Sequence, residues 1–98
     1  MTNLKDKVVV LTGASRGIGA ATARSLAEEK PILILCARTK AANEKTLTDV
    51  KTIGAESESH GFDVSDPSQV NKFVEDIVQR HGRIDVLINN AGTGKMGS

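Results

Sequence analysis

The chain has 98 residues, which suits one small domain or part of one. Its 13 basic and 12 acidic residues leave a net charge of +1, which excludes the strong basic bias typical of nucleic-acid and membrane-surface binding. No apolar run reaches the roughly 18 residues of a transmembrane helix, and Met1–Lys7 lacks a secretory signal. The single cysteine, Cys36, cannot form an internal disulfide. We expect a cytoplasmic protein without a membrane or nucleic-acid partner.

The first predicted elements are a strand and a helix joined by a glycine-rich turn. Residues 8–11 are a continuous apolar run, which is typical of a strand buried on both faces of a parallel sheet. The spacing that follows predicts a helix from about Gly17 to Lys30. Four of its side chains are expected to face inward: Ile18, Thr22, Leu26 and Ala27.

A second strand and a second helix follow in the same order. Residues 32–37 form another continuous apolar run, and a helix is predicted from about Thr39 to Ile53, with Gly54 ending it. The apolar face of this helix is weak and consists of Leu47, Val50 and Ile53. Residues 56–62 occupy the place of a third strand, and because most of them are polar we expect an edge strand there.

The clearest helix is predicted from Pro67 to His81. Five apolar side chains recur at helical spacing on one face: Val70, Phe73, Val74, Ile77 and Val78. Asp66 can cap the first turn together with Gln69, Pro67 suits the first helical position, and Gly82 suits a left-handed end. A fourth strand is expected at residues 86–88.

These predicted elements alternate as β-α-β-α-β-α-β. Such alternation predicts an α/β fold with a parallel sheet and right-handed crossovers. The sequence shows no repeat, no low-complexity tract and no linker, so we expect residues 1–98 to be part of a single domain.

Residues 12–19, Thr-Gly-Ala-Ser-Arg-Gly-Ile-Gly, follow the first predicted strand and open the first predicted helix. Gly13, Gly17 and Gly19 allow a sharp turn and a close approach of the backbone to a pyrophosphate, which free N–H groups at the helix N-terminus can bind. The spacing is G-x-x-x-G-x-G rather than G-x-G-x-x-G. Glycines in a tight strand-to-helix turn can also have a purely conformational role.

Three motifs in this order resemble those of the short-chain dehydrogenases/reductases. Residues 12–19 resemble the cofactor loop of that family, Asp63-Val64 its adenine-contacting pair, and Asn89-Asn90-Ala91-Gly92 its signature after the fourth strand. The resemblance covers nearly the whole chain. It implies a Rossmann-type doubly wound parallel sheet with strand order 3-2-1-4, in which a dinucleotide lies where the strand order reverses.

The residues predicted to bind this cofactor are Gly13, Ser15, Arg16, Gly17, Ile18, Gly19, Arg38, Asp63, Val64, Asn90, Ala91 and Gly92. The resemblance implies that Ser15, Arg16 and Ile18 contact the phosphates or the adenosine ribose. It also implies that Asp63 accepts a hydrogen bond from the adenine amino group, beside the backbone of Val64.

The segment after the fourth predicted strand has two interpretations. By resemblance, Asn90, Ala91 and Gly92 line the ribose. The amides of Asn89 and Asn90 can instead have a structural role, in which they only tie neighbouring strands together. Both interpretations stay open at this point.

The end of the second predicted strand favours NADP(H) over NAD(H). NAD-binding proteins of this type usually carry a carboxylate about 20 residues beyond the glycine loop, where it binds the ribose 2′-hydroxyl. This strand ends instead at Arg38, whose guanidinium can bind a 2′-phosphate with paired, charge-assisted hydrogen bonds. Arg16 is placed to approach the same phosphate. A solvated surface arginine is the other interpretation of Arg38.

The resemblance implies hydride transfer that interconverts a carbonyl and a hydroxyl group of a small-molecule substrate. The tyrosine, lysine and serine that the family uses lie beyond the fourth strand, and this sequence contains no tyrosine. We expect the chain to be the cofactor-binding part of a longer reductase, with no catalytic residue and no activity alone. The alternative is a non-catalytic nucleotide-binding module or half of a two-chain assembly.

Three further expectations concern surfaces and side chains. His60 and His81 have no partner at metal-ligand spacing, so no metal site is expected. Cys36 is expected to be a small buried hydrophobic residue. In a chain of this length residues 86–88 would form an exposed apolar edge strand, which predicts self-association into a homo-oligomer.

Overall fold

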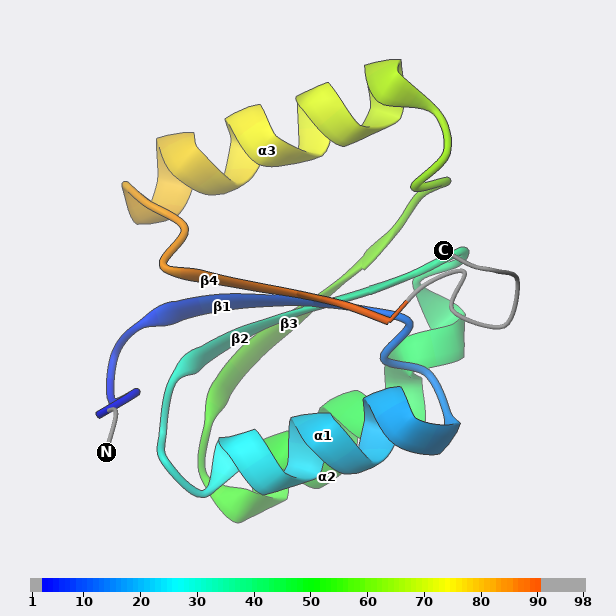
Figure 1. The fold of residues 1–98 in the computed structure, drawn as a ribbon. Helices are drawn as coiled ribbons and strands as arrows, with labels where there is room; N and C mark the ends of the chain where they lie inside the picture. The colour runs from blue at the N-terminus through cyan, green and yellow to red at the C-terminus, as the bar shows by residue number, and fades with distance from the viewer. Residues whose placement is uncertain (1–2, 91–98) are drawn as a thin grey trace.

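The computed structural model describes residues 3–90 and confirms the predicted alternation of strands and helices (Figure 1). The strands in this range are β1 (Val8–Thr12), β2 (Ile32–Ala37), β3 (Glu56–Gly61) and β4 (Val86–Asn89). The helices are α1 (Gly17–Ala27), α2 (Glu44–Ile53) and α3 (Pro67–His81), and a short 3-10 turn, η1 (Ala41–Asn43), precedes α2. None of these helices is both long and apolar enough to cross a bilayer.

The strands form one parallel sheet with the predicted order β3-β2-β1-β4. Helices α1 and α2 lie side by side on one face of this sheet, and α3 lies on the other (Figure 1). The strand order reverses at β1, because the chain runs outward from β1 through β2 to β3 and then returns to place β4 on the other side. This Rossmann-type arrangement brings the loops after β1, β2 and β3 together at the carboxyl edge of the sheet.

The core is densest on the face covered by α1 and α2. The fully buried side chains there come from β1, the loop after β1, β2 and both helices: Val9, Leu11, Ala14, Ala23, Ala27, Leu33, Leu35 and Val50. Because β1 and β2 are buried on both faces, their apolar runs are continuous rather than alternating, as the sequence predicts. The other face carries Val8, Val10, Ile34 and Cys36, which pack against Ile77 of α3.

Helix α1 begins at Gly17 as predicted but differs from its prediction in the position of Ile18 and at its C-terminal end. Ile18 is 79% exposed rather than facing inward, because the first turn of α1 lies beside the cleft described below and not over the sheet. The helix ends at Ala27, three residues before Lys30. Backbone N–H groups of residues 28–30 donate to carbonyls three positions earlier, and Lys30 then adopts a left-handed φ of 62° before the buried Pro31.

Helix α3 follows its prediction from Pro67 to His81, including both ends. Asp66 accepts hydrogen bonds from the backbone N–H groups of Ser68 and Gln69, and Gly82 ends the helix with a left-handed φ of 86°. The apolar face of α3 is only partly buried, since Ile77 is buried but Val74 and Val78 are 38% and 45% exposed.

The polar strand β3 is an edge strand, as its composition predicts. Glu58 in β3 accepts hydrogen bonds from Arg80 and His81 at the end of α3 and from His60 in the same strand. These contacts hold the pKa of Glu58 at about 2, with the Arg80 hydrogen bond as the largest cause. The cluster therefore ties the C-terminal end of α3 to β3.

Candidate functional site

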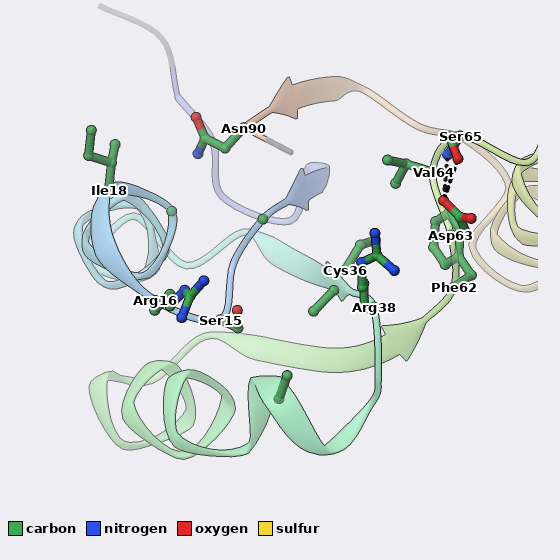
Figure 2. Close-up of a pocket in the computed structure, with 14 residues that line it drawn as sticks. Ser15, Arg16, Ile18, Cys36, Arg38, Phe62, Asp63, Val64, Ser65 and Asn90 are labelled. Atoms are coloured by element: carbon green, nitrogen blue, oxygen red, sulfur yellow. Dashed lines mark hydrogen bonds between the residues drawn. The ribbon is translucent and has the colours of Figure 1, made fainter. Parts of the chain in front are cut away.

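A cleft of about 930 Å³ opens at the carboxyl edge of the sheet (Figure 2). Its walls come from the loop after β1, the first turn of α1, the end of β2 and the loop after β3. The lining residues are Gly13, Ser15, Arg16, Ile18, Gly19, Cys36, Ala37, Arg38, Ala42, Phe62, Asp63, Val64, Ser65 and Asn90. The cleft lies where the strand order reverses, which is where parallel α/β sheets bind ligands.

The three glycines of the loop are required for two different structural reasons. Gly13 and Gly17 take left-handed φ values of 65° and 59°, which side chains with a Cβ rarely adopt. Gly19 is required by space, because a Cβ there would lie 1.8 Å from the carbonyl oxygen of Gly13. The loop therefore folds back onto the start of α1, and the backbone itself forms one wall of the cleft.

The N-terminus of α1 carries no side-chain cap. Arg16 occupies the capping position in an extended conformation, and its side chain accepts no hydrogen bond from the helix. The first backbone hydrogen bond at this end runs from the N–H of Ala20 to the carbonyl of Arg16. The N–H groups of residues 17–19 are thus left without helical acceptors, and together with the helix dipole they form an anion-binding position.

Two guanidinium groups line the same cleft. Arg16 and Arg38 are both exposed, and neither guanidinium group makes a hydrogen bond or an ion pair with another described residue from 3 to 90 (Figure 2). Arg16 directly precedes the open N–H groups of α1, whereas Arg38 follows β2 on the other side of the cleft, next to Asp63 (Figure 2). Both guanidinium groups are suited to bind phosphate groups.

A carboxylate lines the cleft on the same side as Arg38 (Figure 2). Asp63 Oδ1 accepts hydrogen bonds from the backbone N–H and the hydroxyl of Ser65, at 2.9 and 2.7 Å (Figure 2). These two bonds, and more weakly the charge of Arg38, lower the pKa of Asp63. The group is therefore ionised and acts only as a hydrogen-bond acceptor.

The two asparagines after Leu87 have different environments. Asn89 Oδ1 accepts a hydrogen bond of 2.8 Å from the Thr12 hydroxyl, which ties β4 to β1. The backbone N–H of Asn90 also donates to that hydroxyl, but its side-chain Nδ2 is buried without a partner and belongs to the cleft wall. The structural interpretation thus fits Asn89, while the Asn90 amide keeps a donor for a ligand.

Most of the predicted cofactor residues come together in this cleft. Of those within residues 3–90, all line it except Gly17, which instead shapes the loop. Ala91 and Gly92 lie outside the described residues. In the described part of the chain no group of three or more His, Cys, Asp or Glu side chains is arranged to hold a metal ion.

Sequence analysis did not identify five of the lining residues: Cys36, Ala37, Ala42, Phe62 and Ser65. Each lies at or just after the carboxyl end of a strand, or in η1, and the known position of strand ends is the signal that could have found them. Cys36 is buried as predicted, and desolvation, with a smaller effect of Glu58, raises its pKa to about 12. Its thiol is consequently a packing group.

Comparison with known sequences shows similarity to several reductases. The chain is 45% identical over 92 residues to a protein named monensin polyketide synthase putative ketoacyl reductase from Streptomyces virginiae, covering 94% of this chain and 35% of that protein. It is 37% identical over 98 residues to sepiapterin reductase from Chlorobaculum tepidum, covering 93% of this chain and 40% of that protein. The chain thus spans between a third and two fifths of the length of these relatives.

Solved structures show the same relationship. A metagenomic short-chain oxidoreductase in complex with NADP superposes with a TM-score of 0.88 at 41% identity, covering 93% of this chain and 41% of that one. An NAD+-bound xylitol dehydrogenase superposes with a TM-score of 0.81 at 36% identity, covering 88% of this chain and 33% of that one. The model of the short chain dehydrogenase family matches residues 7–98, and the chain therefore belongs to this family of oxidoreductases.

Proposed function

We propose that this chain binds NADP(H) and supplies the cofactor-binding part of an oxidoreductase that interconverts a carbonyl and a hydroxyl group by hydride transfer. The observation that carries the proposal is a cleft lined by two guanidinium groups that make no ion pair within residues 3–90, Arg16 at the uncapped N-terminus of α1 and Arg38 directly after β2. A ribose 2′-phosphate is a dianion near neutral pH, and paired charge-assisted hydrogen bonds from arginine suit it.

The individual roles follow the two sides of the cleft. The backbone N–H groups of residues 17–19 would bind the pyrophosphate, with Ser15 and Ile18 beside them. Asp63 and Val64 would hold the adenine, and the free Nδ2 of Asn90 would donate to the ribose. The cofactor would supply the hydride, and these residues would bind and orient it.

The solved structures similar to this chain include one with NADP and one with NAD+. The superposed oxidoreductase at 41% identity holds NADP, whereas the superposed xylitol dehydrogenase holds NAD+. The position after β2 supports NADP(H) for this chain, because Arg38 stands where a carboxylate would repel a 2′-phosphate.

Binding measurements on the full chain test the cofactor assignment. By titration calorimetry we expect NADP+ to bind at least about tenfold more tightly than NAD+, and Arg38→Gln to remove most of this difference through loss of a charge-assisted contact. Arg24→Gln is the matched control, because Arg24 is an exposed arginine paired only with Asp49 at 3.7 Å. Equal affinity of the unchanged chain for both cofactors would contradict the NADP(H) preference.

We further propose that this chain alone does not turn over substrate. It contains no tyrosine, the residue that serves as proton donor in the family that it resembles. The second candidate is a non-catalytic nucleotide-binding module or half of a two-chain assembly. Sustained oxidation of NADPH by the purified chain with a panel of ketones, above a control without protein, would overturn this proposal.

Self-association is proposed on the uncovered side of β4. Within residues 3–90, β4 pairs only with β1, and Leu87 is 64% exposed. An open strand edge beside exposed apolar side chains recruits further chains, so we expect a homo-oligomer. Sedimentation velocity showing a monomer at high protein concentration would exclude it.

A further inference from the structure

The loop between β3 and α3 holds the Asp63 carboxylate in an asymmetric way. Both hydrogen bonds from Ser65 end on one oxygen, Oδ1. The other oxygen, Oδ2, accepts no hydrogen bond from any residue in the range 3–90. The carboxylate therefore presents one occupied and one vacant acceptor, and the residue as a whole lines the cleft.

The backbone of Asp63 is fixed from the other direction by α3. Its N–H donates a 2.9 Å hydrogen bond to Gln69 Oε1, and Gln69 Nε2 donates a 2.9 Å hydrogen bond to Asp66 Oδ2. Asp66 is at the same time the cap of α3. Gln69 thus links the cap of a well-formed helix to the residue that lines the cleft, and the loop position follows that of the helix.

The chemistry of the vacant oxygen is selective. An ionised carboxylate can only accept, so Oδ2 attracts an N–H group and repels a carbonyl oxygen. Phe62 and Val64 flank Asp63 in the cleft wall, and Val64 is 44% exposed. A flat, mostly apolar group with an amino substituent at its edge fits these neighbours.

We infer that Ser65 and Gln69 are positioning residues that hold Asp63 so that the cleft selects a 6-aminopurine nucleotide over a 6-oxopurine nucleotide. This inference rests on the proposed function, because it concerns the base of the same cofactor. Neither residue needs to touch the base. Ser65 occupies Oδ1 and thereby prevents the carboxylate from rotating toward Arg38, whose charge acts on it already. Gln69 holds the main chain on which that carboxylate stands.

The test compares NADP+ with the analogue that carries a 6-oxo group in place of the adenine 6-amino group. Calorimetric titration of the full chain should show tighter binding of NADP+ by about tenfold or more. Ser65→Ala and Gln69→Leu should each reduce this ratio to about threefold or less, and Ser65→Thr should retain it because it keeps the hydroxyl. Ser68→Ala is the matched control, since only the backbone of Ser68 is engaged in the loop.

A second readout keeps the inference testable if Ser65→Ala does not fold. The carboxyl carbon of Asp63 can be titrated by NMR in the unchanged chain and in Ser65→Cys, which keeps the shape but is a weak donor. The Asp63 pKa should rise toward its ordinary value of 3.8 in that variant. Equal affinity for both nucleotides in the unchanged chain would overturn the inference while leaving NADP(H) binding intact. Failure to bind either nucleotide would overturn both.

Discussion

The N-termini of α1 and α3 differ in how their unpaired backbone N–H groups are satisfied. At α3, Asp66 accepts hydrogen bonds from the N–H groups of Ser68 and Gln69, and Pro67 has no N–H to satisfy. At α1, Arg16 stands in the capping position, and its side chain gives the helix no acceptor. The N–H groups at the α3 start thus have acceptors within the chain, whereas those at the α1 start have no side-chain acceptor and remain open to a ligand.

This difference shows that one helix start can contribute to stability while another is left open for binding. A capped helix start contributes about 1 kcal/mol to stability, and an uncapped one forgoes that contribution. The α1 start lies at the cleft, where its N–H groups are open to a ligand. The α3 start fixes the loop that carries Asp63 at the same edge of the sheet. Variants can break this contrast at either helix.

The largest effect is expected at Gly19. A Cβ at this position would lie 1.8 Å from the Gly13 carbonyl oxygen, so Gly19→Ala must displace the loop from the start of α1. We expect a loss of about 3 kcal/mol or more in the free energy of unfolding, measured by urea denaturation. Gly17→Ala is the control, because no atom lies within 4 Å of its Cβ position and only the cost of a left-handed φ of 59°, about 1 kcal/mol, remains.

The next effect concerns the far end of α3 and depends on pH. Because the pKa of Glu58 is lowered from 4.5 to about 2, its contribution to stability is fully present above pH 4.5 and is lost as the pH falls toward 2. Glu58→Gln should cost about 1.5 kcal/mol at neutral pH, the low end for hydrogen bonds to charged groups, since the cluster is partly exposed. The variant should also flatten the stability profile between these pH values. An unchanged acid profile in Glu58→Gln would show that other groups control acid unfolding.

At the start of α3, removal of the cap should lower stability and leave phosphate recognition alone. Asp66→Ala leaves the N–H groups of Ser68 and Gln69 without an acceptor, so thermal unfolding should reveal a loss of about 1 kcal/mol. Asp66→Ser, which can still cap, should recover most of it. The ratio of NADP+ to NAD+ affinity should be the same in both variants, and a change in this ratio would tie the α3 cap to the phosphate side of the cleft.

The smallest effect on stability is expected at Arg16, where stability and NADP+ affinity should change in opposite directions. Arg16→Ser introduces a capping side chain into a backbone that is already extended, so the free energy of unfolding should rise by about 0.5 kcal/mol. NADP+ affinity should fall in the same variant, because the anion loses a cation and must compete with the new cap. Arg16→Gln separates the two effects, since it removes the charge without supplying a cap. A gain in both stability and affinity would refute the contrast between the helices.

The sequence predicts elements well where local signals and burial agree. The α3 bounds follow from Asp66, Pro67 and Gly82, whose conformational preferences act regardless of the rest of the fold. Ile18 was assigned to the core incorrectly, because helical spacing assumes that every turn packs on the sheet, and the glycine loop instead places the first turn beside the cleft. The prediction of a helix from Thr39 was also too long, since residues 41–43 form a 3-10 turn before α2 begins at Glu44.

In the candidate site, too, some residues were predictable from the sequence and others only from the tertiary structure. Motif residues such as Arg16, Arg38 and Asp63 were predicted because their chemistry is visible in the sequence. Ser65 and Phe62 were missed because their contribution depends on where strand ends converge, which no local pattern encodes. The asymmetric hold on Asp63 likewise needs coordinates, because the two bonds to a single oxygen cannot be inferred from the spacing of a serine two residues later.

The burial of Cys36 has a practical consequence for experiments on this chain. It is the only cysteine in the sequence, it is fully buried, and its raised pKa keeps it protonated and unreactive toward thiol-directed reagents. A cysteine introduced at an exposed position such as Lys72 would therefore be the sole reactive handle. A fluorophore or spin label could be attached there at one site without first removing the native residue, and it would report on α3 in otherwise unaltered protein.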